Sequence, residues 1–593
     1  MKLRAGAIVA LVGMSLCPIA VDTVSAAPTP QSPDAVLNAV KQSPNASIGP
    51  LLGNLYEEYL LATRGAKAKP FKSSNPVLKV VNDRVAVDMV ARDAGSLVRS
   101  LRAAGATQII ARGSLVSARV PVEALGKLAA LDSLNYARPV LARTNALSKP
   151  VISQGVASMN AGDLGYTGTG VTVGVLSDSF ACNPPAFQPG APTSTKDEDV
   201  SSDDLPDDVE ILADGCPGGS DEGRAMAQIV HDVAPGAGIK FHTAFVSELD
   251  FAEGIIDLQK AGAKVIVDDV IYFVEPMFSD GPIAQAVDIV AGEGVTYFSS
   301  AGNNGRASYE APFRPVDIPI NAGRNVNGAI GRGPVTLTFH DFSAEPGVQP
   351  LQPVQVQSDG VAGVHVLSFQ WDQPHLRATE YAQLMSGGDT ADAVGAESDL
   401  DLVFFTDKGT VVPLCPPGVA RGITCQITGD RNIGGDAVDL AVIVYSGPKP
   451  SEVFYVGIVK SGGPAPGHVK YVPFDIQGGY VPLAYDTKSG TSYGHANAAG
   501  ALSIGAASWY ATRPYSATMT FPPRNALDSA IDLTSCDPAC LNDFSSAGGV
   551  PIFLDKFGKR LESAQIRVNP SVTGPDGGNS TFFLSDSTMT ATV

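Results

Sequence analysis

The chain has 593 residues, enough for roughly three or four domains of ordinary size. Hydrophobic residues make up 44% of the sequence and charged residues only 17%, a balance that is typical of a globular protein and excludes a coiled coil or a wholly disordered chain. Acidic residues outnumber basic ones 60 to 41, and the net charge of −19 repels phosphate backbones and anionic lipid surfaces. The composition therefore predicts no nucleic-acid partner.

The first 26 residues have the pattern of a secretory signal peptide. Lys2 and Arg4 precede an apolar run that ends near Val21, and small residues follow at a site suited to signal peptidase. A membrane anchor is the alternative, but the run is short and Pro18 interrupts it. We therefore predict a signal peptide at 1–26, a secreted or periplasmic location, and no stable membrane insertion.

Six cysteines remain after this segment. An even number outside the cytosol favours disulfide bonds over free thiols. A metal site is less favoured, because the last two cysteines lack a second Cys or His pair at a suitable spacing. Of the 15 possible connectivities of six cysteines, proximity along the chain favours Cys182 with Cys216, Cys415 with Cys425, and Cys536 with Cys540, and the other connectivities stay open.

Residues 27–148 divide into a leader and a small folded unit. The leader, up to about Pro76, is rich in Pro, Ser and Ala and holds two short helical stretches, 35–41 and 50–62. Strand and helix patterns then follow in the order RVAVDMVA, SLVRSLRAAGA, TQIIA, LVSARVP, VEALGKLAAL and LNYARPV. This order predicts a βαββαβ unit, for which an unrelated ferredoxin-like module is one interpretation.

Residues 149–312 alternate between apolar strands and helices. The strands VTVGVLS, KVIVDDV and GVTYFSS are separated by helical patterns, which predicts an α/β fold with a parallel sheet flanked by helices. Functional residues of such sheets gather at the carboxyl ends of the strands, where Asp178 and Asn303 both lie.

The pattern changes to alternating strands between 313 and 486. Six such runs, among them VHVLSFQWD and SDLDLVFFTDKG, are separated by turn residues and predict a β-sandwich insert. Residues 487–593 return to the earlier style, with ALSIGAASWY and NDFSSAGG. The parallel sheet is therefore expected to be built from two separate parts of the chain.

Four segments occur in the order used by subtilisin-like serine proteases. The first, GYTGTGVTVGVLSDSF, resembles the strand that delivers the catalytic aspartate, and Asp178 is the matching carboxylate. In such enzymes this aspartate orients and charges the general base. Ser179 and Phe180 follow where the family has a small residue and then Gly, which leaves the register open by one residue. An Asp at a strand end also commonly caps a helix or forms a turn.

The second segment, DEGRAMAQIVHDVAPGAGI, resembles the helix that begins with the catalytic histidine, but Glu222 stands in its place. Sedolisins, relatives that use Ser, Glu and Asp, have a glutamate at a similar distance before the Ala-Pro segment. On a helical wheel Glu222 shares a face with Met226, Ile229 and Val233, which we expect to be the buried face. His231 lies roughly 13.5 Å further along the helix, too far to serve the same point.

Two interpretations of Glu222 stay open. It either takes part in catalysis or merely satisfies free N–H groups and the dipole at a helix N-terminus. In the first case Asp178 and Glu222 would share charge in a confined site, which raises one pKa and predicts an acid-shifted activity optimum.

The third segment, YFSSAGNNG, resembles the one whose asparagine donates to the oxyanion, and Asn303 is the matching residue. A plain turn is the alternative for this Gly/Asn sequence. The preceding strand, VIVDDVIYF, resembles the segment that lines the substrate cleft. Asp268 and Asp269 replace small polar residues there, which favours basic or polar substrate side chains.

The fourth segment should carry the nucleophile. Ser492 follows Gly490 and Thr491 as the nucleophile does in the family, but the next segments, from ALSIGAASWY to RVNPSVTGPDG, resemble those that precede the nucleophile. In this register the serine block belongs after Asp576, where no Gly-Thr-Ser occurs. We therefore expect the nucleophile to be missing and the second catalytic part, 487–593, to be truncated, with Ser492 as the lesser candidate.

The resemblance implies a secreted serine-type endopeptidase homologue that acts on protein or peptide substrates. Its 27–148 unit resembles the inhibitory propeptide that plugs the cleft of these proteases, and its insert resembles a prepeptidase C-terminal sandwich. We expect no required cofactor, although Asp399, Asp401 and the acidic stretch 197–210 are candidate calcium ligands or simply solvated acidic faces. The alternative function is a secreted binding protein with an inactive protease cleft.

Overall fold

The computed structural model describes most of the chain after residue 44. The predicted signal peptide and three of the cysteines, Cys415, Cys536 and Cys540, lie outside the described residues. The described ranges are 45–63, 71–75, 77–144, 153–183, 194–320, 335–360, 362–406, 410–412, 425–427, 431–446, 449–509, 512, 541–578 and 580.

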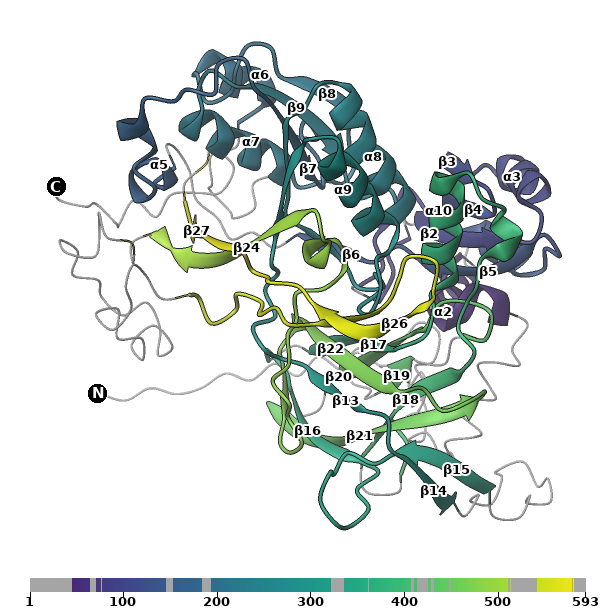
Figure 1. Cartoon of the computed structure of the whole chain (residues 1–593). Coiled ribbons are helices and arrows are strands. Elements are labelled where there is room, and N and C mark those ends of the chain that lie inside the picture. The colour runs from purple at the N-terminus through teal and green to yellow at the C-terminus, as the bar shows by residue number, and fades with distance from the viewer. Residues whose placement is uncertain are drawn as a thin grey trace, which may run out of the picture.

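A seven-stranded parallel sheet forms the centre of the α/β domain (Figure 1). Its strand order is β27 (Val572–Asp576), β24 (Ala501–Ser508), β12 (Thr296–Ser300), β10 (Val265–Asp268), β7 (Thr172–Ser177), β9 (Gly238–Thr243) and β8 (Glu210–Ala213). The two edge strands on one side come from beyond residue 500, so the prediction of a parallel sheet assembled from two parts of the chain is confirmed.

Helices cover both faces of this sheet, as expected when strands alternate with helices. On β7, Val173 and Val175 pack with α7 (Glu222–Val233), while Leu176 packs with α8 (Glu248–Lys260) and α9 (Pro282–Gly292). Side chains of neighbouring strand residues point to opposite faces. The alternation along β7 therefore explains why two separate apolar cores form around one sheet.

The predicted βαββαβ order is confirmed in the N-terminal module, which we define as the described residues between 45 and 144. It contains β1 (Val80–Val81), β2 (Arg84–Ala91), α3 (Ala94–Ala103), β3 (Thr107–Arg112), β4 (Leu115–Pro121), α4 (Leu125–Ala129) and β5 (Leu134–Pro139) in an antiparallel sheet. Helix α2 (Gly49–Thr63) buries Leu52 and Leu55 in the same core, so this part of the predicted leader belongs to the module.

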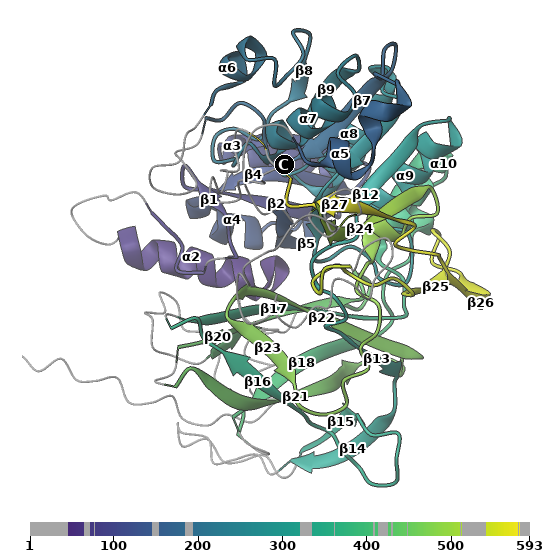
Figure 2. The same ribbon diagram turned by 90° about the vertical axis from the view of Figure 1, so that its left-hand side faces the viewer.

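The predicted β-sandwich occupies the lower half of the molecule (Figure 2). One sheet is β13-β22-β17-β20-β19, and the other is β14-β15-β21-β16-β23 with β18 on β21. The bounds are β13 (Tyr309–Pro312), β14 (Pro315–Ile320), β15 (Val335–His340), β16 (Gln352–Gln357), β17 (Gly363–Trp371), β18 (Asp399–Phe405), β19 (Cys425–Ile427), β20 (Val438–Tyr445), β21 (Ser451–Gly462), β22 (His468–Gln477) and β23 (Gly479–Pro482). The insert also contains α10 (Leu376–Ser386), which the alternating pattern did not predict.

Short elements connect these units. Strand β6 (Ala142–Thr144), at the end of the module, pairs antiparallel with β11 (Val270–Tyr272), which follows β10 directly. A hairpin of β25 (Pro551–Leu554) and β26 (Arg560–Ile566) lies between the α/β domain and the sandwich (Figure 1). The short helices are α5 (Gly155–Ser158) and α6 (Lys196–Ser201). Within the described part of the chain, no helix is long and apolar enough to cross a membrane.

A buried ionic network joins the module, the α/β domain and the insert. Arg138 of β5 lies 2.8 Å from Asp436 of the insert and 3.2 Å from Glu248 at the start of α8. Arg377 of α10 lies 3.1 Å from the same Glu248 and 3.4 Å from Asp88 of β2. All five side chains are at most 10% exposed. The three units therefore meet around two guanidinium groups.

This network predicts a pH dependence of stability. Burial raises the pKa of Glu248 to about 7, although Arg138 and Arg377 act in the opposite direction. The folded state then binds this proton more tightly than the unfolded chain, so stability declines as pH rises from about 4.5 to about 7. Glu248→Gln keeps the group neutral, and we expect its melting temperature to fall by about 3 °C less than that of the wild type between pH 5 and pH 8.

Calorimetry across this pH range measures the effect. Glu253→Gln is the matched control, because Glu253 lies on the same helix but pairs with the exposed Arg112. Parallel pH profiles for the wild type and Glu248→Gln would contradict the prediction.

Candidate active site

Asp178 lies directly after β7 and binds the N-terminus of α7. Its carboxylate accepts hydrogen bonds from the backbone N–H groups of Ser220 and Glu222, the latter at 3.2 Å. Its side chain is 4% exposed, and its backbone carbonyl accepts the hydroxyl of Thr243 at 2.7 Å. A carboxylate is favourable at this end of a helix because free N–H groups and the helix dipole meet there. Asp178 thus orients the helix that carries Glu222.

The loop before α7 is fixed by Asp221, which is fully buried. Asp221 adopts a positive φ of 64° and accepts hydrogen bonds from the N–H groups of Cys182 and Asn183 at 2.8 and 2.9 Å. Arg224 forms ion pairs with Asp221 and with Asp199. The first turn of α7 is therefore held by charge pairs on both sides.

The buried face of α7 differs from the predicted one. Met226, Ile229 and Val233 are only partly buried, while the buried side includes Arg224, Gln228 and His231, with small alanines between them. Ion pairing compensates the buried guanidinium, which the apolar pattern alone does not reveal. Glu222 is itself 4% exposed, as expected for a residue at the start of the core side.

The carboxyl group of Glu222 meets that of Asp269, the residue that follows β10. Both carboxylate oxygens of Asp269 are buried, as is one of Glu222. Burial, the neighbouring charge of Glu222 and the hydrogen bond between the two groups hold the pKa of Asp269 well above its usual range. Two carboxyl groups in such proximity disfavour each other's ionised form, which accounts for the raised pKa of Asp269. The sequence predicted that Glu222 pairs with Asp178. In the structure the carboxylate of Asp178 instead accepts hydrogen bonds from backbone N–H groups.

Asp268 points into a different environment from its neighbour. It lies 3.0 Å from Nε2 of His495 and accepts the hydroxyl of Ser299 and the N–H of Val270. Because Asp268 is 4% exposed and bound on these sides, it contributes to the protein interior. The predicted role of Asp268 in contacting substrate side chains has no support from this placement.

His495 is held between two carboxylates. Its Nδ1 lies 2.8 Å from Glu275, and its Nε2 faces Asp268. Burial alone would lower the pKa of His495, but Glu275 and Asp268 outweigh it and raise the pKa to about 10. The side chain is therefore an imidazolium at neutral pH. Gly494 has a φ of 66°, and a Cβ there would lie 2.7 Å from the carboxyl carbon of Glu275, so glycine allows this close approach.

Asn303 follows β12, next to β10 in the sheet, and is partly exposed. Its loop is supported by the segment around Ser546: the N–H of Ser546 donates to Gly302 at 2.9 Å, and its Oγ accepts from the N–H of Asn304 at 3.0 Å. Gly302 has a φ of 98°, which favours glycine. Asp178, Asp269 and Asn303 thus follow the three neighbouring strands β7, β10 and β12. Glu222 contacts Asp178 through its backbone N–H and Asp269 through its carboxyl group.

Ser492 lies in a buried position. It is 0% exposed, its N–H donates to Ala547 at 3.0 Å, and its hydroxyl lies 3.4 Å from that of Ser503. A nucleophile must reach a substrate that enters from solvent. This geometry gives Ser492 no such access.

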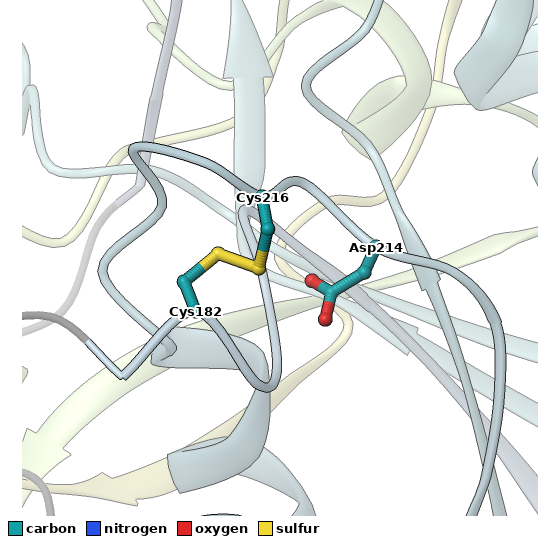
Figure 3. Close-up of side chains that lie close together, drawn as sticks. All are labelled: Cys182, Asp214 and Cys216. Carbon is teal, nitrogen blue, oxygen red and sulfur yellow. A yellow bond between two sulfur atoms is a disulfide. The ribbon is translucent and has the colours of Figure 1, made fainter.

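The described residues contain one close group of three potential metal ligands, Cys182, Asp214 and Cys216 (Figure 3). The two cysteines form a disulfide with an S–S distance of 2.09 Å, as predicted, and so cannot act as thiolate ligands. Asp214 accepts the N–H groups of Phe180 and Ala181 at 2.9 and 3.0 Å. The group is therefore a structural brace of the loop beside α7. Cys425 is also disulfide-bonded. Calcium binding by the acidic residues stays a prediction.

Sequence reasoning missed His495 and Glu275. His495 lies three residues after Ser492, in a segment that was considered only for its serine, and Glu275 lies 220 residues away along the chain. The signal that could have indicated them is a charged residue inside an otherwise apolar or small-residue run, because such a residue must find a buried partner.

The fold and site define an α/β protein with carboxyl groups gathered at the carboxyl ends of a parallel sheet. No family model matches the chain. A probable subtilase-type serine protease of Deinococcus radiodurans is 25% identical over 269 residues, which cover 41% of this chain and 36% of that protein. Over this region the chain is therefore similar to a subtilase-type serine protease, and the match spans little more than a third of the relative's length.

Two solved structures show weaker similarity. The CspB protease of Clostridium perfringens is 11% identical, with 72% of this chain and 83% of that chain covered at a TM-score of 0.33. Fervidolysin from Fervidobacterium pennivorans, a keratinolytic enzyme related to subtilisin, is 12% identical, with 64% and 78% covered at a TM-score of 0.23. Neither similarity assigns a substrate to this chain.

The His495 arrangement predicts a large effect of a single substitution. His495→Gln leaves the carboxylates of Asp268 and Glu275 buried without their cation, and we expect the free energy of unfolding to fall by about 3–5 kcal/mol. Urea unfolding followed by tyrosine and tryptophan fluorescence measures this loss. His231→Gln is the control, since His231 pairs at 3.8 Å with Asp203, whose side chain is exposed. Equal losses in the two variants would contradict the prediction.

Proposed function

We propose that the protein is a serine-type endopeptidase homologue in which Glu222 is the base and Asp269 positions it, with Asn303 as oxyanion donor. The observation that carries this proposal is the meeting of the Glu222 and Asp269 carboxyl groups at the carboxyl end of the sheet. A generic helix cap would turn its carboxylate toward free N–H groups, a role that Asp178 already fills. We therefore assign Glu222 to proton transfer and the capping of α7 to Asp178.

The carboxyl pair suits proton transfer. When Asp269 keeps its proton and hydrogen-bonds Glu222, the ionised Glu222 can accept a proton from a serine hydroxyl or a water molecule and return it to the leaving amine. Because the pKa of Asp269 is raised, the pair retains one proton at a pH where an exposed aspartate has lost it. The proposed catalysis therefore keeps the acid-shifted activity optimum expected from the sequence. The partner of Glu222 in the carboxyl pair is now Asp269, in place of Asp178.

Strand β11 provides a binding edge for an extended peptide. It begins with Val270, immediately after Asp269, and its three residues pair antiparallel with Ala142–Thr144 of the module. Strand addition of this kind is a general mode of peptide recognition. We propose that a substrate occupies the place of β6, so that the module, as the propeptide, blocks the site while β6 remains there.

A second function is supported by the burial of Ser492. If Ser492 does not reach a substrate and no other serine replaces it, the same strand edge and carboxyl pair would form a secreted binding protein for extended peptides. Peptide hydrolysis distinguishes the two functions, because binding alone releases no product. Secretion itself is tested by cleavage of the first 26 residues during export.

The first catalytic prediction concerns Glu222. Glu222→Gln is neutral and of nearly the same shape, so we expect it to lower kcat/KM for peptide hydrolysis by about 10²–10⁴-fold without changing the melting temperature strongly. Hydrolysis of a peptide library between pH 4 and pH 7 provides the measurement. Ser492→Ala is the accompanying variant: loss of activity in this variant while it remains folded would make Ser492 the nucleophile and overturn our register.

The second prediction concerns the pH profile. Asp269→Asn preserves a hydrogen-bonding group but cannot ionise, so we expect it to move the alkaline limb of the kcat/KM profile to higher pH and to cost less than tenfold at the optimum. Asp257→Asn, which changes an exposed carboxylate of α8, is the control and has no such effect. An unchanged alkaline limb in the kcat/KM profile of Asp269→Asn would show that Asp269 does not hold the proton that the reaction needs.

The third prediction tests inhibition by β6. Replacing Ala142–Thr144 by three glycines weakens strand pairing with β11, because glycine is unfavourable in strands. We expect faster peptide hydrolysis or, if the chain only binds, tighter binding of an extended peptide. The same replacement in the exposed loop at 345–347 serves as the control.

A further inference from the structure

We propose that the N-terminal module remains bound as a permanent subunit after the chain between it and the α/β domain is cut, and that the sandwich insert and α8 form its binding surface. This inference rests on the proposed function only in treating β6 as the segment that blocks the site. Activation then requires β6 to leave β11, while the rest of the module stays in place.

The first support is the direction of the buried ion pairs. Arg138 comes from the module and reaches Asp436 of the insert, while Arg377 comes from the insert and reaches Asp88 of the module. Glu248 of α8 forms ion pairs with both guanidinium groups. Each side thus supplies one arginine to the other side's carboxylate. Departure of the module would leave these charges without their partners.

The second support is a shared apolar core. One continuous cluster includes side chains of the module, of the loop after β11 and of one sheet of the insert, among them Val87, Leu134, Phe273, Val366, Leu440 and Val442. All six are at most 5% exposed. Separation would expose apolar surface on both sides, as it would for the interface of a stable dimer.

The third support lies at the edge of this surface. The N–H of Ser114 in the module donates to Glu380 of α10 at 2.9 Å. Arg112 of β3 forms two hydrogen bonds with Glu253 of α8, at 3.0 and 2.9 Å. These contacts join the module to α8 and α10 in addition to the buried network, whereas the blocking strand β6 has three residues. The module is therefore attached far more extensively than its blocking segment.

The experiment cuts the chain without using its own activity. A foreign protease site flanked by glycine and serine is inserted in the segment 145–152 of the full chain, with Glu222→Gln present throughout. After cleavage is complete on a denaturing gel, size-exclusion chromatography shows whether the two pieces travel together. We expect co-elution of the wild-type pieces at pH 6 and in 0.5 M salt, since buried pairs are weakly screened.

Two arginine variants test the surface. We expect Arg377→Ala to release the module at least 100-fold faster than the wild type, because it removes a buried ion-pair partner. Arg112→Ala, with its side chain 53% exposed, should release it less than tenfold faster. Asp88→Asn provides the same test from the module's side if Arg377→Ala folds poorly.

Elution of the wild-type module as a separate piece would overturn the proposal. So would equal release rates for Arg377→Ala and Arg112→Ala, because the buried network would then not hold the module. Peptide hydrolysis by the uncut and cut chains with Glu222 restored is measured separately. Retention without hydrolysis contradicts the proposed catalysis and leaves the subunit inference standing.

Discussion

The imidazolium of His495 between Asp268 and Glu275 is the interaction on which the site depends. These two carboxylates bracket the segment that contains Asp269 and all of β11. A buried cation with two buried anions fixes both ends of this segment at once, and breaking either contact leaves an uncompensated charge. The position of Asp269 next to Glu222, and the course of the strand that pairs with β6, both follow from this constraint.

The β-sandwich insert supports the same segment from the other side. Gln370 of β17 donates to the carbonyl of Glu275 at 2.8 Å and accepts the N–H of Met277 at 2.8 Å. Ser368 donates to the carbonyl of Phe273. A strand in the middle of the insert thus satisfies buried backbone groups of the loop after β11. The insert is therefore part of the framework of the site as well as a surface for the module.

Much of the fold was predictable because it rests on local patterns. Strands β7, β10 and β12, and the βαββαβ order of the module, follow from apolar periodicity and turn residues. Helix α10 was not predictable, since a single helix inside a region of alternating strands gives only a weak helical pattern in the sequence. The buried face of α7 was predicted wrongly, because Arg224 is buried by ion pairs with Asp221, one turn away on the same chain segment, and with Asp199, 25 residues earlier.

The sequence by itself indicated that Asp178 and Asn303 follow strands of the parallel sheet and that Glu222 begins a helix. It also suggested the Cys182–Cys216 pair from proximity along the chain, although the two cysteines are 34 residues apart, with α6 and β8 between them. Only the tertiary structure decided that Asp178 binds the helix N-terminus while Asp269 meets Glu222. The reason is geometric, because the direction of each side chain decides which of the neighbouring carboxylates become partners. Strand register and distant charges such as His495 fix these directions.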